Sequence, residues 1–300
     1  MTASRDSEEI ASIRAAVLAL CANFPGEYWR TLDRERGYPT EFVNALTEAG
    51  FLAALIPEQY GGSGLTMSSA IAIMEEIQAA GCNGAACHAQ MYTMGTVLRH
   101  GNADQKQRYL PKIATGELRL QAFGVTEPTS GTDTLALRTT AVRDGNDSYV
   151  INGQKIWTSR AEYSDLMLLL ARTTPREQVK KRTEGLSVFL VDMKAAGERL
   201  KINPIRTMMN HATTEVFFDD LRVPAENLVG EEGQGFRYIL SGMNAERILI
   251  AAECIGDCNG SSREPAIMPR SARCSAARSG RIRVSSFRSR APTRRCAPPS

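Results

Sequence analysis

The stretch that decides the fold is FGVTEPTSGTD at residues 123–133, which is followed at residues 152–162 by NGQKIWTSRAE. The first segment places a turn-forming run directly after an apolar, strand-like sequence. Pro128 fixes its own φ, and Gly131 can adopt a positive φ. Short hydroxyl side chains accompany them, so the loop offers backbone N–H groups and hydroxyls to a polar or anionic ligand. On composition alone, an ordinary polar hairpin loop is the simpler interpretation.

The second segment favours a ligand site. Asn152-Gly153 is a strong two-residue turn signal between two short β-prone runs, so the sequence predicts a hairpin here. Trp157, followed at once by Thr158 and Ser159, gives a flat apolar surface with hydroxyls at its edge. Such a surface suits a planar aromatic cofactor that needs one stacked face and in-plane hydrogen bonds. A Trp that fills the core at the end of a strand is the alternative.

Residues 1–119 are expected to form an all-helical N-terminal domain. Apolar residues recur every three or four positions in four segments, and glycines follow several of them. Asn102, with Gln105 three residues later, predicts a capping box for a further short helix that Pro111 limits. The four segments are residues 10–21, 39–50, a stretch from Ser68 or Ser69 to residue 81, and residues 85–100.

From residue 120 the pattern changes to short apolar runs separated by Gly, Asn, Asp and Pro, which predicts an antiparallel β domain over residues 120–232. The charged stretch 173–185 is expected to be a surface loop. A final helix is expected within residues 233–257. Asn244 and Arg247 are three apart on this helix and share one face, which either points into a cleft or is a solvated polar face.

Composition excludes several classes of protein. The chain has 300 residues, of which 43% are hydrophobic, but it has no apolar run of 18 residues and no apolar signal-peptide core at its start. We therefore expect a cytoplasmic protein that does not associate with membranes. The seven Cys and three His show no metal-ligand spacing, so we expect no metal site.

The two opening segments resemble the flavin-binding signatures of the acyl-CoA dehydrogenase family, which run roughly TEPxxGSD and KxWxTN. The resemblance extends over residues 1–257. Thr132 stands where the family usually has Ser, and Ser159-Arg160 stand where Thr-Asn is common. The first exchange keeps the hydroxyl, so the hydrogen-bonding chemistry is retained while substrate and subfamily stay open.

The resemblance implies an α+β multidomain fold: an N-terminal helical domain (1–119), a flavin-binding middle β domain (120–232) and the first helix of a C-terminal helical domain (233–257). It also implies the residues that contact FAD and the acyl-CoA substrate. Thr132, Asn244 and Arg247 are the expected substrate contacts. The expected FAD contacts are Phe123, Val125, Thr126, Gly131, Thr132, Trp157, Thr158 and Ser159.

The implied reaction is FAD-dependent α,β-dehydrogenation of an acyl-CoA thioester to an enoyl-CoA, with an electron-transfer flavoprotein as acceptor and a homodimer or homotetramer as the intact enzyme. The family's catalytic carboxylate lies about a hundred residues beyond residue 257, so no catalytic residue is expected in this chain. Glu127 is interpreted as part of the turn motif, and Glu246 as a solvated helix residue. A non-catalytic fragment is the alternative.

Residues 258–300 break the pattern. They contain ten Arg, no Lys and one Glu, a net charge of +9; because the whole chain has +3, residues 1–257 have −6. A basic arm on a related flavoprotein could bind nucleic acid or an anionic membrane, although the acidic body argues against nucleic acid. The alternative is a shifted reading frame that yields a disordered tail. One choice of synonymous codons for this tail, re-read two bases later, gives a helix-periodic sequence that resembles the family's next segment. The genomic DNA around codon 257 tests this hypothesis.

Overall fold

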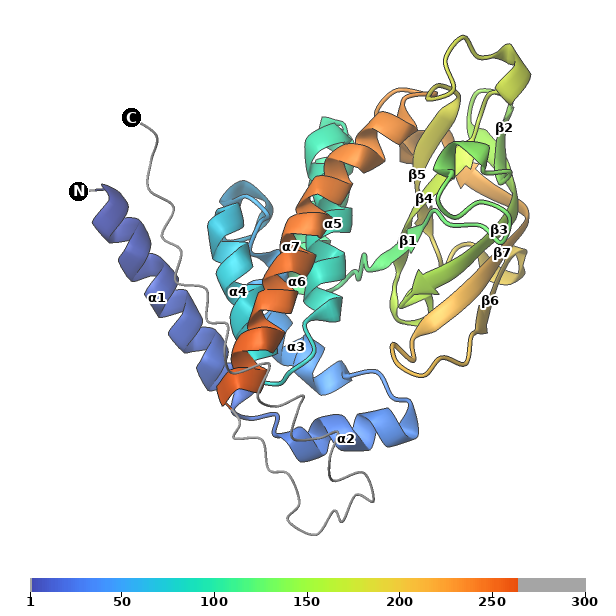
Figure 1. The fold of residues 1–300 in the computed structure, drawn as a ribbon. Coiled ribbons are helices and arrows are strands. Elements are labelled where there is room, and N and C mark those ends of the chain that lie inside the picture. Colours follow the sequence, from blue (N-terminus) through green and yellow to red (C-terminus); the bar gives the residue numbers. More distant parts are fainter. Residues whose placement is uncertain (1, 264–300) are drawn as a thin grey trace, which may run out of the picture. The chain divides into compact units, whose positions relative to one another are not determined.

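The computed structural model describes residues 2–263, with side chains from residue 7 to residue 261 (Figure 1). The predicted α+β multidomain architecture is confirmed, with a helical domain, a β domain and a long helix that follows them. The helices are α1 (Thr2–Cys21), α2 (Gly26–Glu35), α3 (Thr40–Glu48), α4 (Met67–Ala79), α5 (Ala85–His100), α6 (Ala103–Thr115) and α7 (Gly235–Arg263). The strands are β1 (Ala122–Gly124), β2 (Thr140–Asp144), β3 (Ser148–Ser159), β4 (Leu166–Arg172), β5 (Leu186–Asp192), β6 (Leu200–Pro204), β7 (Thr213–Pro224) and β8 (Leu228–Val229).

The helix limits differ from the expected ones at two places. Thr66, rather than Ser68 or Ser69, caps α4, because its hydroxyl accepts a hydrogen bond from the Ser69 N–H. The capping box of Asn102 and Gln105 is confirmed. The prediction that Pro111 limits this helix is wrong: α6 continues to Thr115 and ends at Gly116, which has a φ of 78°.

Helix α2 was not predicted. It follows Pro25, and although none of its residues is fully buried, Tyr28 and Trp29 pack against the apolar core of the helical domain. The Trp29 ring packs edge-on against Tyr28 and Phe42, with ring centroids 5.1 and 5.0 Å apart. Aromatic contacts therefore hold this helix beside α3.

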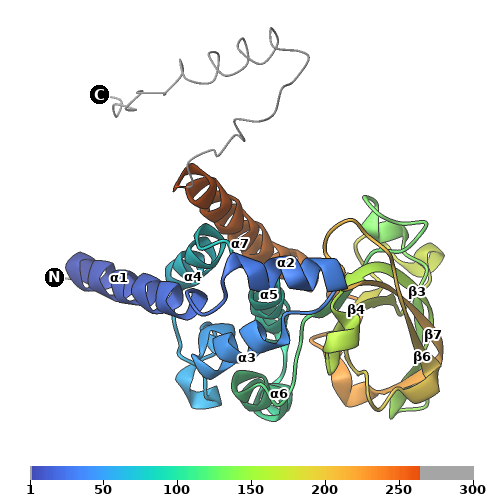
Figure 2. The same ribbon diagram turned by 90° about the horizontal axis from the view of Figure 1, so that it is seen from below.

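The β domain is one eight-stranded sheet in the order β6-β7-β3-β2-β4-β5-β8, with β1 paired to β4. Most pairs are antiparallel as predicted, but β1 and β2 both pair with β4 in parallel. In Figure 2 the strands curve around a common interior. That interior is an apolar cluster to which seven strands, β1 to β7, contribute, including the fully buried Tyr149 and Phe189.

The predicted hairpin at Asn152-Gly153 is wrong. Both residues lie inside the continuous strand β3, at a register shift against β7. Gly153 has a φ of 147°, and a Cβ at this position would lie 2.6–2.8 Å from atoms of Thr139. Asn152 instead exchanges two hydrogen bonds with Asp220 of β7, at 2.9 and 2.8 Å. The pairing with β7 overrides the local turn signal, and Gly153 permits the close approach of Thr139.

The expected limit of the final helix also needs correction. Residues 258–263, expected to belong to an irregular tail, continue α7. Two glycines explain why α7 can pack closely against α4. A Cβ on Gly256 would lie 2.4 Å from the Glu75 carbonyl oxygen, and a Cβ on Gly260 would lie 2.9 Å from the Ala79 carbonyl oxygen. Figure 1 shows α7 running alongside α4 and α5. The predictions about residues 264–300 lie outside the described residues.

The helical and β domains share a continuous apolar core. Residues of α5 and α6 pack with alternate residues of β4 and β5, such as Leu168 and Val188. The Gln105 side-chain amide donates to the Glu226 and Leu228 carbonyls at 2.7 and 2.8 Å. These contacts fix the first strand of the β domain beside α5, where the candidate site forms.

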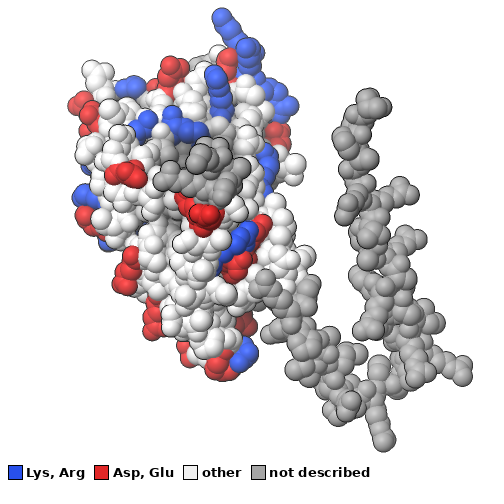
Figure 3. All heavy atoms as spheres, turned by 90° about the vertical axis from the view of Figure 1, so that its left-hand side faces the viewer, with Lys and Arg blue, Asp and Glu red and all other residues white. Residues whose placement is uncertain are grey.

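The surface described by the structure carries both signs of charge. On the face seen in Figure 3, Lys and Arg gather towards the top, and Asp and Glu are spread over the face below. The loop 173–185 is mostly exposed, as predicted. Among the described helices, none combines the length and hydropathy that crossing a membrane requires.

Candidate functional site

A cleft of about 790 Å³ lies where α2, α5 and α7 face the loop after β1 and the end of β3. The structure therefore brings together two sequence motifs that lie more than twenty residues apart. The predicted residues that line the cleft are Phe123, Val125, Thr126, Gly131, Trp157 and Ser159.

Trp157 has an unusual backbone and an exposed ring. Its φ is 61°, and it lies where β3 shifts register against β7 between Lys155 and Thr158. Its relative exposure is 57%, which excludes the alternative of a Trp that fills the core. A non-glycine residue held in the left-handed region is costly and is commonly found at functional sites. The bulge turns the indole of Trp157 towards the cleft rather than into the sheet interior.

Thr158 and Ser159 place hydroxyls next to this indole. Thr158 is 1% exposed, and its Oγ1 has no hydrogen-bond partner among the described residues. Ser159 Oγ accepts a hydrogen bond from Asn210 Nδ2 at 2.9 Å. Ser159 lines the cleft, whereas Thr158 is not among the lining residues, so the contact between Thr158 and FAD stays a prediction.

The loop after β1 is held to β3 by a buried ion pair. Glu127 Oε1 lies 2.8 Å from Lys155 Nζ, and these side chains are 4% and 0% exposed. Glu127 also accepts hydrogen bonds from the Arg138 and Thr139 N–H groups at 2.6 and 2.9 Å. Lys155 Nζ donates to the Val125 carbonyl at 3.1 Å. The interpretation of Glu127 as part of the turn motif is thus confirmed.

The two charges of this pair shift each other's pKa. Burial lowers the pKa of Lys155 to about 8, although the Glu127 carboxylate opposes the shift. Burial alone would raise the pKa of Glu127, but the Lys155 charge and the hydrogen bonds to the carboxylate outweigh it and hold that pKa below its usual value. The pair is therefore ionised near neutral pH and rigidifies the loop.

The tip of the loop is open. A Cβ on Gly131 would meet nothing within 4 Å. Thr132 lies beside it, exposed and outside the residues that line the cleft. Ser130 Oγ donates to the Asp133 carbonyl at 2.6 Å, which closes the turn. The exposed backbone at Gly131 is accessible to a bulky polar group.

The expected substrate contacts on α7 lie outside the cleft. Arg247 Nη1 donates to Asn244 Oδ1 at 3.1 Å, so the two residues do share a face, but both are exposed. Met243, Glu246 and Glu253 line the cleft instead. Substrate binding by Asn244 and Arg247 stays a prediction, whereas Glu246 is only partly exposed and borders the site.

Sequence reasoning missed a polar cluster at the α5 end of the cleft. His88 and Tyr92 come from α5, Arg160 follows β3, and Glu253 comes from α7. His88 Nδ1 lies 3.1 Å from Glu253 Oε1, and the His88 and Tyr92 rings are 5.3 Å apart. No local motif joins these residues; the only available signal was Arg160, which departs from the family pattern.

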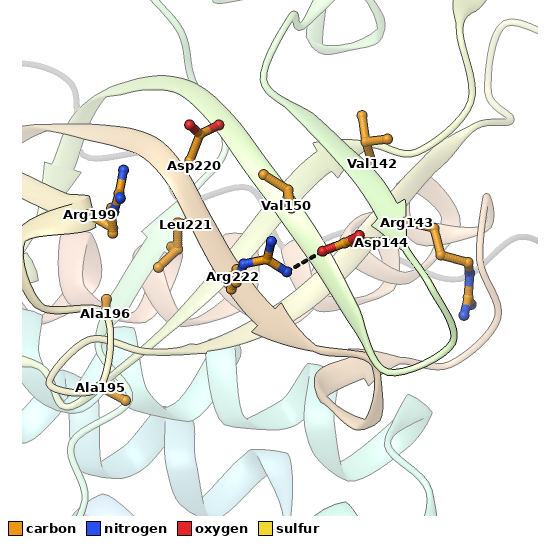
Figure 4. Close-up of a pocket in the computed structure, with 10 residues that line it drawn as sticks. All are labelled: Val142, Arg143, Asp144, Val150, Ala195, Ala196, Arg199, Asp220, Leu221 and Arg222. Carbon is orange, nitrogen blue, oxygen red and sulfur yellow. Dashed lines mark hydrogen bonds and ion pairs between the residues drawn. The ribbon is translucent and has the colours of Figure 1, made fainter.

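A second hollow of about 630 Å³ lies on the β domain and contains none of the predicted residues (Figure 4). Arg222 and Asp144 form an ion pair across it, and Arg143 points away from both. Arg143 instead contacts the Glu232 carboxylate at 3.3 Å. These contacts engage Arg143, Asp144 and Arg222, whereas Arg199 lines the hollow without a hydrogen bond or ion pair to any described residue.

The residues in the first cleft fit a flavin. The exposed Trp157 ring supplies a stacking face, and Ser159, which also lines the cleft, supplies a hydroxyl at its edge. The open backbone at Gly131 leaves room for an attached phosphate-bearing chain. Together they match a planar ring system with polar edges and an anionic extension.

Comparison with known proteins defines the class. Residues 7–117 match the model of the acyl-CoA dehydrogenase N-terminal domain, and residues 122–221 match that of the middle domain. These matches cover more than half of the chain. The chain belongs to the acyl-CoA dehydrogenase family, whose members named below are oxidoreductases.

Individual relatives agree with this assignment. The chain is 33% identical over 231 residues to cyclohex-1-ene-1-carbonyl-CoA dehydrogenase of Syntrophus aciditrophicus, a match that covers 76% of this chain and 55% of the relative. An acyl-CoA dehydrogenase structure from Geobacillus kaustophilus aligns with a TM-score of 0.78 and 26% identity, covering 94% of this chain and 75% of that one. A structure described as the electron transferring flavoprotein of Acidaminococcus fermentans aligns with a TM-score of 0.76 and 30% identity, covering 85% and 66%. The chain thus spans just over half the length of the first of these relatives.

Proposed function

We propose that this chain binds FAD and acts in the α,β-dehydrogenation of an acyl-CoA thioester to an enoyl-CoA. The observation that carries the proposal is the cleft that an exposed, left-handed Trp157 lines together with Ser159 and Gly131. Family membership supports the reaction class, because the relatives are named acyl-CoA dehydrogenases. The substrate's acyl group is not determined by these features.

In this proposal the chain's residues bind and orient a flavin, which supplies the site that accepts a hydride from the β-carbon. Trp157 stacks on one face of the ring, while Thr158 and Ser159 offer hydroxyls to its edge. Val125 and Thr126 contact the polar edge, and Phe123 closes the side towards α5, where it packs edge-on against Tyr92 with ring centroids 5.5 Å apart. Gly131 and Thr132 lie at the phosphate-bearing end. The buried Glu127–Lys155 pair holds these two segments in register.

A carboxylate must remove the α-proton, because a weakly acidic C–H bond requires a positioned general base. We expect this base in the C-terminal region of the family fold, outside the described residues. Within them, Glu246 offers a second location. Asp33 and Glu253 also line the cleft, but they contact His211 and His88, whereas Glu246 makes no hydrogen bond or ion pair in the part of the chain that the structure describes.

Glu246→Gln distinguishes the two locations. If Glu246 is the base, the unaltered chain with added FAD reduces an acyl-CoA-dependent dye, and the variant is slower by about 10²–10⁴-fold. The exposed Glu117→Gln serves as the matched control and keeps full activity. If the unaltered chain shows no turnover once contaminating enzyme is removed, the base lies beyond the described residues, as we expect.

Trp157→Ala tests the flavin site itself. We expect the dissociation constant for FAD to rise about tenfold or more, because a stacked aromatic contact contributes on the order of 1 kcal/mol beyond its buried area. Titration of FAD followed by flavin fluorescence measures it. Trp157→Phe keeps a flat ring, so its dissociation constant for FAD is expected to rise less than that of Trp157→Ala. An unchanged dissociation constant in Trp157→Ala would remove the observation on which the proposal rests.

The proposed partners follow from the same family. An electron-transfer flavoprotein is the expected electron acceptor, and the alignment with a structure described by that name supports it. Self-association as a dimer or tetramer is expected for the intact enzyme. Nucleic-acid binding is the weaker alternative, because residues 1–257 are acidic and Figure 3 shows Asp and Glu spread over the face below its basic top. The shifted reading frame after Asp257 stays a proposal that genomic DNA tests.

A further inference from the structure

The polar end of the cleft contains several buried groups that lack partners. Gln121 is 1% exposed, and its Nε2 has no hydrogen-bond partner among the described residues. His88 is 6% exposed, and its Nε2 is likewise without a partner there. The Nε atom of Arg160 is also buried and has no hydrogen-bond partner among the described residues. His211 Nδ1 and Glu253 Oε1 of the same cleft are also buried without a hydrogen-bond partner among the described residues. Because native proteins satisfy nearly all buried polar groups, the three nitrogen atoms of Gln121, His88 and Arg160 indicate a ligand with acceptor atoms.

These groups are held in place by their neighbours. Tyr38 Oη donates to Gln121 Oε1 at 2.7 Å, which orients the amide so that Nε2 is the free donor. The Tyr38 ring in turn stacks on Tyr163, with ring centroids 4.1 Å apart. On the other side, His88 Nδ1 contacts Glu253. The arrangement is built by α5, α7, the segment before β1 and the segment after β3, so it does not depend on one flexible loop.

The Arg160 guanidinium has no oppositely charged partner in contact with it among the described residues. Its guanidinium makes no hydrogen bond or ion pair with any described residue. Burial lowers its pKa, while the nearby Tyr92, Tyr38 and Glu253 oppose the shift. An arginine stays protonated in proteins, so a desolvated guanidinium gains most from a bound anion. Glu253, whose charge acts on Arg160, is already in contact with His88.

We propose that this end of the cleft binds a carboxylate at the far end of the substrate's acyl chain, with Arg160 as its ionic partner and Gln121 as a second donor. The inference rests on the proposed function, since the cleft must hold an acyl thioester. It assigns the substrate to the dicarboxylic acyl thioesters. Arg160 thereby determines specificity rather than taking part in the chemical step.

The backbone at Arg160 supports a functional reason for this residue. Its φ is 61°, and its N–H donates to the Ala212 carbonyl at 2.7 Å. Asn adopts this left-handed conformation more easily than Arg does. Arg is less favourable than Asn in this backbone conformation. Its side chain makes no hydrogen bond or ion pair with a described residue that would compensate. Arg160→Asn is therefore expected to fold with an equal or higher Tm.

The test compares glutaryl-CoA with pentanoyl-CoA, which share a five-carbon acyl chain and differ in the terminal carboxylate. Isothermal titration of the full chain is expected to show glutaryl-CoA binding roughly tenfold tighter or more, as a charged hydrogen bond implies. Arg160→Asn removes this preference without lowering Tm. Arg160→Lys keeps part of it, because an ammonium retains the charge but loses the two-pronged geometry. Arg176→Asn, in the exposed loop 173–185, retains the full preference.

The outcomes separate this inference from the proposed function. Equal affinity for both thioesters in the unaltered chain overturns the carboxylate site and leaves acyl-CoA binding intact. Failure of both thioesters to bind refutes the proposed function and this inference together. A preference that survives Arg160→Asn overturns the role of Arg160, and a preference lost together with a fall in Tm makes that role structural.

Discussion

We expect Lys155→Met to lower the free energy of unfolding by about 3–5 kcal/mol at pH 7, because it leaves the Glu127 carboxylate buried without its counter-charge. Lys155 is completely buried and lies 2.8 Å from Glu127. Met has a similar length, so lost packing contributes little. Urea unfolding followed by circular dichroism measures the change. Lys201→Met, an exposed lysine on β6, is the matched control and should be within about 0.5 kcal/mol of the unaltered protein.

The loss should depend on pH in a defined direction. In the unaltered protein the pKa of Glu127 lies below its usual value of 4.5, so its ionised form adds stability above pH 4.5 that is lost as pH falls through the folded-state pKa. In Lys155→Met, burial is no longer opposed by Lys155, and the pKa of Glu127 should rise. The difference between the two proteins is then larger at neutral pH than below about pH 4.5. A difference that is independent of pH between 3 and 7 would contradict the ion-pair account.

Lys155 itself gives a slope of the same sign at alkaline pH. Its pKa is about 8 in the folded protein, below its usual value of 10.5. The unfolded chain therefore binds more protons between these values, and this group makes stability rise as pH increases from about 8 to 10.5. Lys155→Met should lose that rise.

Gly153→Val is expected to destabilise the protein by about 3 kcal/mol, because any Cβ at this position overlaps Thr139 at 2.6–2.8 Å. The nearest Thr139 atoms include the backbone Cα, so a side-chain rotation cannot relieve the overlap. The same urea unfolding experiment measures it. Since Gly153 lies in the strand that carries Trp157, FAD affinity should fall as well.

Gly145 provides the control for the backbone conformation. It also has a positive φ, 63°, but a Cβ there would meet nothing within 4 Å. Gly145→Ala therefore reports the conformational penalty alone, and Gly153→Ala reports that penalty together with the overlap. Equal losses in the two alanine variants would show that the approach of Thr139 is not what requires glycine at 153.

Local sequence determined much of this molecule. The capping box at Asn102, the apolar spacing of the helices and the change to short β-prone runs after residue 120 all depend on residues a few positions apart. Such signals reflect backbone hydrogen bonding and one-sided burial, which act over one or two turns or strands. The two motifs around Thr126 and Trp157 were therefore recognisable, and six of the eight predicted FAD contacts line one cleft.

Tertiary structure decided the rest. Asn152-Gly153 has the local preference of a hairpin turn, yet pairing with Asp220, 68 residues later, keeps β3 continuous. The buried pair of Glu127 and Lys155, and the polar cluster around Arg160, join residues from separate elements that no spacing rule connects. A few tenths of a kcal/mol of turn preference cannot outweigh a strand ladder, and the desolvation of a charge is fixed only once distant segments pack around it. The sequence thus determined which segments could bind a ligand, and only the packing of α5, β3 and α7 decided which charges face it.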